Sequence, residues 1–154
     1  MTIKDWIDSA DGYYKTARFL ENPVIEVQYK IDSIKSSWYL LHHSLELYLK
    51  AILMNYDKYS KTDTKIHNLT ELLNMVDGLN PKIDEKLKKV VDNRSIKQWI
   101  SFINPFGYPN GGIRYMQKGK SMYATPLGIS YFFNELIDVI NSECNQEKEI
   151  DELV

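Results

Sequence analysis

A chain of 154 residues with 44% hydrophobic residues and a formal net charge of −2 has the size and composition of one globular domain. No apolar run approaches the roughly 18 to 20 residues of a membrane-spanning helix, and the single cysteine excludes an internal disulfide and a cysteine-based zinc site. The charged, aromatic start has no signal-peptide core, so we expect a cytoplasmic protein with no membrane partner.

Residues 2–20 predict an amphipathic helix. Thr2 and Asp5 have the spacing of a capping box, and Asn22-Pro23 interrupts the pattern after the helix. Apolar residues at spacings of three and four predict the buried face: Ile3, Trp6, Ala10, Tyr13, Ala17 and Leu20.

The next helix begins between Pro23 and Ile31 and reaches about Tyr56 in the sequence pattern. It has two apolar faces, which is typical of a central element with neighbours on both sides. One face contains Ile34, Trp38, Leu41, Leu45, Tyr48, Leu49, Ile52 and Tyr56, and the other contains Leu40, Leu47, Ala51 and Met54. Between the faces lies a polar strip, defined as His42, His43, Glu46 and Lys50.

Shorter helices follow a polar loop. Asn68 with Glu71 predicts a capped helix that ends near Gly78, and Pro81 has the place of a first helical residue. We expect Asn93 to cap "RSIKQWISFI", either as a continuation of that helix or as a separate one.

Residues 104–126 interrupt the helical pattern with a long excursion that contains four of the seven glycines and three of the five prolines. Thr125-Pro126 then opens the last helix, whose apolar stripe contains Ile129, Phe132, Phe133, Leu136, Ile137 and Ile140. The predicted fold is an all-α, up-and-down bundle of about five helices. Residues 1–142 form the bundle, and residues 143–154 form an acidic C-terminal tail with Cys144 as a small core residue.

The polar strip has two interpretations. His42, Glu46 and Lys50, spaced by four, either pair along a wet surface or form a buried network that supports a site, and the narrow width of the strip favours the network. His43-x-x-Glu46 resembles half of a di-metal site, but the matching second histidine pair is absent. We therefore predict neither a metal nor a cofactor. For His67, local hydrogen bonding beside a helix start competes with a catalytic role.

The excursion combines cations with aromatic rings. Residues 93–134 contain no Asp or Glu, while Arg114, Lys118 and Lys120 accompany Tyr115 and other tyrosines. Cations neutralise phosphates and flat rings stack on bases, so this composition is typical of a segment that binds single-stranded nucleic acid. The alternative is a loop whose aromatic residues cover the end of the bundle.

The sequences "WYLLHHSLELYLKAIL" and "IHNLTELL" resemble the HEPN family, the higher-eukaryote and prokaryote nucleotide-binding helical bundles. The match to the family pattern "E-L-x-L-K-A" followed by "H-x-L-x-x-L-L" rests on Glu46, Leu47, Leu49, Lys50, Ala51, His67, Leu69, Leu72 and Leu73. In addition, "DGYYKTARFL" looks like the family's first helix and "IRY" resembles its Arg-Tyr element.

The resemblance implies a helical bundle, often dimeric, that binds nucleotides, cleaves RNA without a metal or accompanies a nucleotidyltransferase. The family's ribonuclease motif, Arg-x(4–6)-His, is absent; the nearest approximation is Lys61 before His67. The question of an enzyme therefore stays open, with His43, His67 and Arg114 as the candidate catalytic residues of a ribonuclease assembled across a dimer.

Three hypotheses follow. The first is a non-catalytic homodimer that binds a nucleotide or RNA and serves a nucleotidyltransferase, a toxin–antitoxin system or a defence system. Its binding residues are Lys50, His67, Arg114, Tyr115, Lys118 and Lys120. The second is a protein-interaction or dimerisation bundle with no nucleic-acid role. The third is the atypical ribonuclease.

Overall fold

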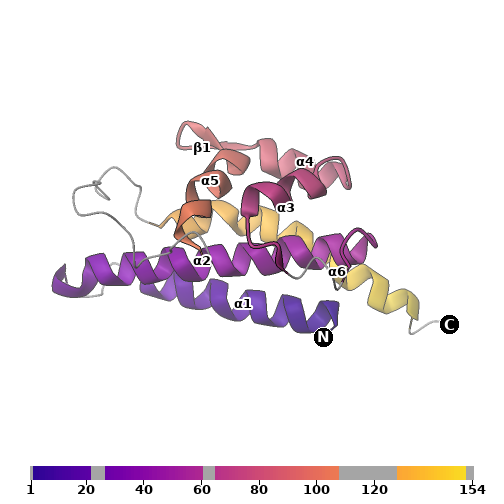
Figure 1. Ribbon diagram of the computed structural model, residues 1–154, viewed down its shortest axis with the longest axis horizontal. Coiled ribbons are helices and arrows are strands. Elements are labelled where there is room, and N and C mark those ends of the chain that lie inside the picture. The colour runs from indigo at the N-terminus through magenta and orange to yellow at the C-terminus, as the bar shows by residue number, and fades with distance from the viewer. Residues whose placement is uncertain (1, 22–26, 61–64, 108–127, 152–154) are drawn as a thin grey trace.

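The computed structural model describes residues 2–21, 27–60, 65–107 and 128–151, and it is all-α (Figure 1). The described residues form six α-helices, short 3-10 turns and one hairpin with two residues in each strand. The predicted all-α helical bundle is confirmed. The long helices are α1 (Ile3–Leu20), α2 (Val27–Asn55) and α6 (Asn134–Asp151).

Helix α1 starts at the predicted capping box, in which the Thr2 hydroxyl accepts from the Asp5 amide and the Asp5 carboxylate accepts from the Thr2 amide. Its buried face differs from the prediction: Ile7 and Tyr14 are each 6% exposed, whereas the predicted Tyr13 is 38% exposed. The predicted Ile3 and Leu20 are only partly buried. Tyr14 follows Ile7 by seven residues, and this repeat of 3.5 residues per turn is the one that packs against another helix.

Helices α1 and α2 form an antiparallel hairpin. The Ser37 hydroxyl donates to the Ala17 carbonyl oxygen at 3.0 Å, and the Ser44 hydroxyl donates to the Ala10 carbonyl oxygen at 2.9 Å. Both alanines are fully buried, so the serines reach the backbone of α1 directly. The two bonds lie seven residues apart on each helix, and they therefore fix the register of the pair.

Helix α6 runs antiparallel to α1. The Tyr14 hydroxyl lies within hydrogen-bond distance of the Asn134 side chain and 2.7 Å from the Ser130 carbonyl oxygen, while Asn141 donates to Asp11 at 3.4 Å. Asp11 also accepts from the Tyr48 hydroxyl of α2. Asp11 thus joins the three long helices through side-chain hydrogen bonds.

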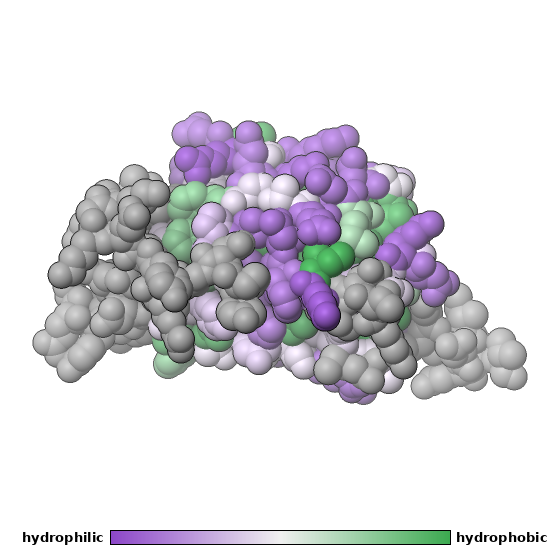
Figure 2. Space-filling view, viewed as in Figure 1, coloured by the Kyte–Doolittle hydropathy of each residue, from purple (hydrophilic) through white to green (hydrophobic). Residues whose placement is uncertain are grey.

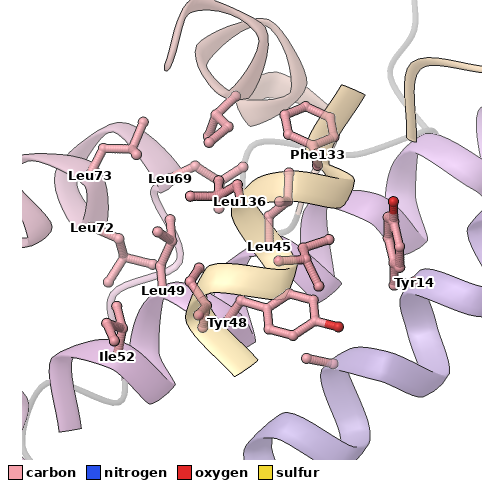
Figure 3. Close-up of a cluster of buried hydrophobic side chains, with 14 of the residues drawn as sticks. Tyr14, Leu45, Tyr48, Leu49, Ile52, Leu69, Leu72, Leu73, Phe133 and Leu136 are labelled. Atoms are coloured by element: carbon pink, nitrogen blue, oxygen red, sulfur yellow. The ribbon is translucent and has the colours of Figure 1, made fainter. Parts of the chain in front are cut away.

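The core lies where α1, α2, α3 (Leu69–Val76) and α6 meet (Figure 3). Tyr48 of α2 points past α6 toward α1, where its hydroxyl meets Asp11, and Phe133 closes the core from the segment before α6. Fully buried members of this cluster are Leu45, Tyr48, Leu49, Ile52, Leu69, Leu72, Leu73 and Phe133. The core therefore joins residues from both ends of the sequence.

The start of the last helix differs from the prediction. Thr125-Pro126 lies outside the described residues, and a 3-10 turn, η5 (Ile129–Phe133), precedes α6. The predicted apolar stripe is buried except at Phe132, which is partly exposed. The predicted boundary after residue 142 falls inside α6, and Cys144 beyond it is buried.

Helices α3, α4 (Pro81–Lys88) and α5 (Ile96–Ile103) lie on the side of α2 away from α1 (Figure 1). Asn68 caps α3 as predicted, and Asn80 caps α4 ahead of Pro81. The prediction that Asn93 caps the next helix is wrong. Asp92 and Asn93 have φ values of 51° and 67°, and they turn the hairpin of β1 (Val90–Val91) and β2 (Arg94–Ser95).

The cap of α5 is Ser95. Its hydroxyl accepts from the Gln98 backbone amide, and the Gln98 side-chain oxygen accepts from the Ser95 backbone amide. After α5 the chain makes a short 3-10 turn, η2 (Asn104–Phe106), that returns to α2. Phe106 packs against Trp38 of α2 with ring centroids 4.9 Å apart. The described residues of the predicted excursion, 104–107, are thus docked on the bundle.

Candidate functional site

The structure buries three of the four residues of the polar strip. His42, Glu46 and Lys50 are 2%, 4% and 3% exposed, whereas His43 is half-buried. Burial of ionic groups is tolerated only where they are paired and hydrogen-bonded. The wet-surface interpretation is therefore wrong for these three residues.

The carboxylate of Glu46 is the centre of the buried group. Its Oε1 atom accepts a hydrogen bond from Lys50 Nζ at 2.6 Å and lies 2.9 Å from His67 Nδ1. Its Oε2 atom lies 4.0 Å from His42 Nδ1. Glu46 and Lys50 are one helical turn apart on α2, while the Asn68 cap of α3 places His67. We call His42, Glu46, Lys50 and His67 the Glu46 cluster.

Aromatic rings enclose the ammonium group of the cluster. Lys50 Nζ lies 5.7 Å from the ring centroid of Trp6 and 5.8 Å from that of Tyr59. Trp6 and Tyr59 also touch each other edge to face at 5.6 Å. Cation–π attraction is stronger where water is excluded, so the rings offset part of the desolvation of Lys50. Sequence reasoning missed both rings, because only the fold brings α1 and the segment after α2 to this lysine.

His42 is the most confined member of the cluster. Burial lowers its pKa to about 4, although the Glu46 carboxylate acts in the opposite direction. Its Nε2 atom has no hydrogen-bond partner among the described residues. A Cβ atom built on Gly107 would lie 2.1 to 2.3 Å from three atoms of the imidazole, so only glycine fits there. Neither feature has a signal in the sequence.

Asn104 connects this corner to α3. Its Oδ1 atom accepts from the Leu69 amide at 2.8 Å, in the first turn of α3. The Asn104 side chain also hydrogen-bonds to His42, and this bond raises the pKa of the imidazole against the larger effect of burial. The turn before Gly107 therefore contacts both α2 and α3.

His43 faces a different neighbour. Its ring meets that of Tyr13 edge to face with centroids 4.5 Å apart, and burial lowers its pKa. Tyr39, one turn earlier on α2, is 40% exposed. His43 thus belongs to the outer surface of the α1–α2 hairpin. Within the Glu46 cluster, His67 is the member nearest to solvent, with its side chain 34% exposed.

Several predicted site residues lie outside the described residues: Arg114, Tyr115, Lys118 and Lys120, as well as Lys61. Of the proposed catalytic set, the structure describes His43 and His67 but not Arg114. Of the proposed binding set, it describes Lys50 and His67, which share Glu46 as a partner. Because Lys50 is almost fully buried, it supports His67 and does not itself offer a surface for a ligand.

Lysines of α4 and its C-cap residue form ion pairs with the last helix. Lys86 and Lys89 form ion pairs with Glu135, at 3.4 and 2.7 Å, and Lys82 lies 3.8 Å from Glu143. The hydrogen bonds from the two lysines lower the pKa of Glu135. Hydrophilic side chains cover this upper part of the molecule in Figure 2, where α4 and the hairpin lie in Figure 1. These pairs neutralise part of the positive charge beside the acid-free segment.

Within the described ranges, no group of three or more His, Cys, Asp or Glu side chains is arranged to hold a metal ion. No described helix is long and apolar enough to cross a membrane. The sequence matches no protein-family model, and it matches no curated protein and no solved structure. The chemistry of the described residues therefore has to carry any functional conclusion.

Proposed function

We propose that this chain is a HEPN-like helical bundle that binds a nucleotide or single-stranded RNA, as a non-catalytic homodimeric accessory of a nucleotidyltransferase, toxin–antitoxin or defence system. The observation that carries the proposal is the meeting of Glu46, Lys50 and His67. These residues carry the family resemblance in the sequence, and their side chains share one carboxylate oxygen, with contacts of 2.6 and 2.9 Å.

His67 is the residue through which the cluster reaches a ligand. The contact with Glu46 favours a proton on Nδ1 and fixes the plane of the ring. Lys50 compensates the charge of the buried Glu46 carboxylate, and the carboxylate in turn keeps His67 oriented. An imidazole held in this way, a third exposed, suits a hydrogen bond to a phosphate or a base edge.

The remaining contacts in this proposal come from Arg114, Tyr115, Lys118 and Lys120. Their charges neutralise phosphates, and the tyrosine ring stacks on a base. Binding then weakens with salt at a slope of about −0.7 per phosphate contact, as expected for single strands.

The test is fluorescence anisotropy of labelled single-stranded RNA and of a labelled nucleotide, titrated with pure protein at 50 mM salt and above. The variant Arg114→Glu/Lys118→Glu should lose binding. The matched control, Lys4→Glu/Lys15→Glu, reverses two exposed charges on α1 and should retain it. His67→Ala should weaken binding without changing the salt slope. RNA and nucleotide that both fail to bind at 50 mM salt and high protein concentration would refute the proposal.

A second candidate function, a protein-interaction bundle, is favoured by a row of partly buried apolar side chains on α2. Leu40, Leu47 and Met54 follow one another at seven-residue intervals and are only partly buried. Such a heptad repeat on a 29-residue helix is typical of a seam that packs against another helix. A bundle that dimerises through this seam but binds no RNA in the titration would fit this function.

The ribonuclease hypothesis has less support. It requires an arginine beside the histidine, and the candidate Arg114 lies outside the described residues, while His67 contacts the carboxylate of Glu46. Incubation of pure protein with total RNA, with and without EDTA, tests it directly. Cleavage in both samples would establish a metal-independent ribonuclease.

A further inference from the structure

The segment formed by Asn104–Gly107 closes over the buried imidazole of His42. Gly107 is itself buried, and it approaches the ring more closely than any other residue type could. Asn104 anchors the start of the segment at the first turn of α3, and Phe106 anchors its middle on Trp38. The segment therefore covers His42 and touches both α2 and α3.

The surroundings of the covered imidazole stabilise a positive charge on the ring only weakly. Nε2 has no hydrogen-bond partner among the described residues, so a proton on that atom would be buried without an acceptor. In the covering segment, the hydrogen bond of the Asn104 side chain favours the charged imidazole, but neither Asn104 nor Gly107 carries a charge that would compensate it. Water would satisfy the N–H group, but water reaches Nε2 only if the segment moves away.

The charged groups around His42 come from two elements. On α2, the Glu46 carboxylate lies 4.0 Å from Nδ1, and His43 is adjacent in the chain. From the segment before α3, His67 contacts Glu46 on the other oxygen. Lys50 binds the same carboxylate. The Glu46 carboxylate attracts a protonated His42. Because Lys50 and His67 already share this carboxylate, it compensates the positive charge of His42 only in part.

We propose that Asn104–Gly107 is an acid-sensitive clasp, which lies on α2 while His42 is neutral and lifts from it when His42 is protonated. The device follows from four features: the ring is buried, its Nε2 atom has no hydrogen-bond partner among the described residues, Asn104 and Gly107 above it are uncharged, and the Glu46 carboxylate is already shared by Lys50 and His67. It gives the bundle a local opening that is distinct from global unfolding.

The expected size of the effect follows from the two protonation equilibria. His42 has a pKa of about 4 under the clasp and would return to about 6.5 when exposed. Between pH 7 and pH 5 the ratio of open to closed forms should therefore rise about 20-fold. The reporter is the amide of Gly107, a residue that is buried in the closed form and would meet water in the open form.

The experiment is amide hydrogen exchange of the full chain, measured by NMR at pH 5 and pH 7 and corrected for intrinsic rates. We expect the protection of the Gly107 amide to fall about 20-fold from pH 7 to pH 5. In His42→Gln the protection should not depend on pH, because the side chain no longer titrates. In the matched control His43→Gln, the 20-fold change should persist.

Amides in the middle of α2, such as that of Leu49, report global unfolding and should keep their protection at both pH values. If Gly107 and Leu49 lose protection in parallel, acid unfolds the whole bundle and there is no clasp. An equal change in wild type and in His42→Gln would also overturn the proposal. If His42→Gln does not fold, direct titration of the His42 ring by NMR decides: a pKa near 6.5 with Gly107 still protected contradicts the mechanism.

Discussion

Glu46 holds His67, 21 residues later in the chain, through a contact of 2.9 Å between Oε1 and Nδ1. The same oxygen accepts from Lys50 at 2.6 Å, and all three side chains lie where α1, α2 and the segment before α3 converge. One carboxylate thus organises a histidine near the surface and a lysine enclosed by aromatic rings. The first prediction follows from its removal.

Glu46→Ala should lower the free energy of unfolding by about 3 kcal/mol or more, because it removes the carboxylate that compensates the buried ammonium of Lys50. Chemical denaturation monitored by circular dichroism measures the change. The matched control is Glu71→Ala on the exposed side of α3, for which we expect less than about 0.5 kcal/mol. A melting temperature that stays within a degree of wild type in Glu46→Ala would contradict the buried pair.

Replacement of both partners should be less harmful than removal of one. In Glu46→Gln/Lys50→Met, neither buried charge remains and the volumes are similar, so most of the loss seen in Glu46→Ala should be recovered. His67 should become more mobile in this variant. NMR relaxation of its ring measures the mobility, and a ring as rigid as in wild type would show that Glu46 does not orient it.

The second prediction concerns pH. Burial lowers the pKa of His42 from 6.5 to about 4, so between these values the unfolded chain binds more protons than the folded one. The free energy of unfolding should therefore fall by up to about 3 kcal/mol as the pH falls from 6.5 to 4. Glu21 has the opposite effect on the free energy of unfolding. Because burial raises its pKa, the folded chain binds a proton that the unfolded chain does not, so this group adds stability as the pH falls.

Comparison of wild type with His42→Gln isolates the contribution of His42 to the pH dependence of stability, since Glu21 and the other titratable groups are common to both proteins. The difference in the free energy of unfolding between wild type and variant, measured by urea denaturation from pH 4 to 7, should narrow toward low pH. A difference that is constant across this range would show that His42 titrates normally in the folded chain.

The third prediction concerns Gly107. An added Cβ atom would lie 2.1 Å from Cε1 of His42, so Gly107→Ala should destabilise the protein by about 1 to 3 kcal/mol through overpacking. Gly12 is the matched control: it lies inside α1, and a Cβ there meets nothing within 4 Å. Gly12→Ala should stabilise the protein by about 0.5 to 1 kcal/mol. Thermal melts of the two variants should move in opposite directions.

The fourth prediction concerns assembly. We expect a homodimer whose mass is twice the 18.1 kDa of the chain, formed through the partly buried seam of Leu40, Leu47 and Met54. Leu47→Lys places a charge in the middle of this seam and should yield monomers by light scattering at tens of micromolar. Val90→Lys changes an apolar residue that is 66% exposed on the hairpin and should leave the mass unchanged. A wild-type monomer would refute the dimer.

Helical periodicity and capping residues predicted much of this fold. The caps at Thr2 and Asn68 depend on side chains three residues from the amides they bind, which a sequence displays directly. Burial of Glu46 and Lys50 was also predictable, because apolar faces flank them on both sides. The prediction of Tyr13 in place of Tyr14 was wrong because a 3.6-residue period drifts from the 3.5-residue period of packed helices.

The remaining differences between prediction and structure have a common cause. Each depends on a residue far away in the sequence or on a backbone conformation that the sequence does not display. Asn93 has the composition of a helix cap, but its positive φ makes it a turn residue. Nothing near Gly107 in the sequence indicates that it faces the imidazole of His42, 65 positions earlier. Trp6 reaches Lys50 because α1 and α2 are antiparallel, and Tyr59 reaches it because the chain turns back after α2.

The bond from the Leu69 amide to Asn104 has a consequence for synthesis on the ribosome. Asn104 follows Leu69 by 35 residues, so at translation rates of about 5 to 20 residues per second α3 leaves the ribosome several seconds before this acceptor exists. During that interval Asn68 is the local acceptor at the start of α3. In a nascent chain that ends before Asn104, the first turn of α3 should consequently fray. That turn should become stable only when α5 and η2 have emerged and Asn104 accepts from the Leu69 amide.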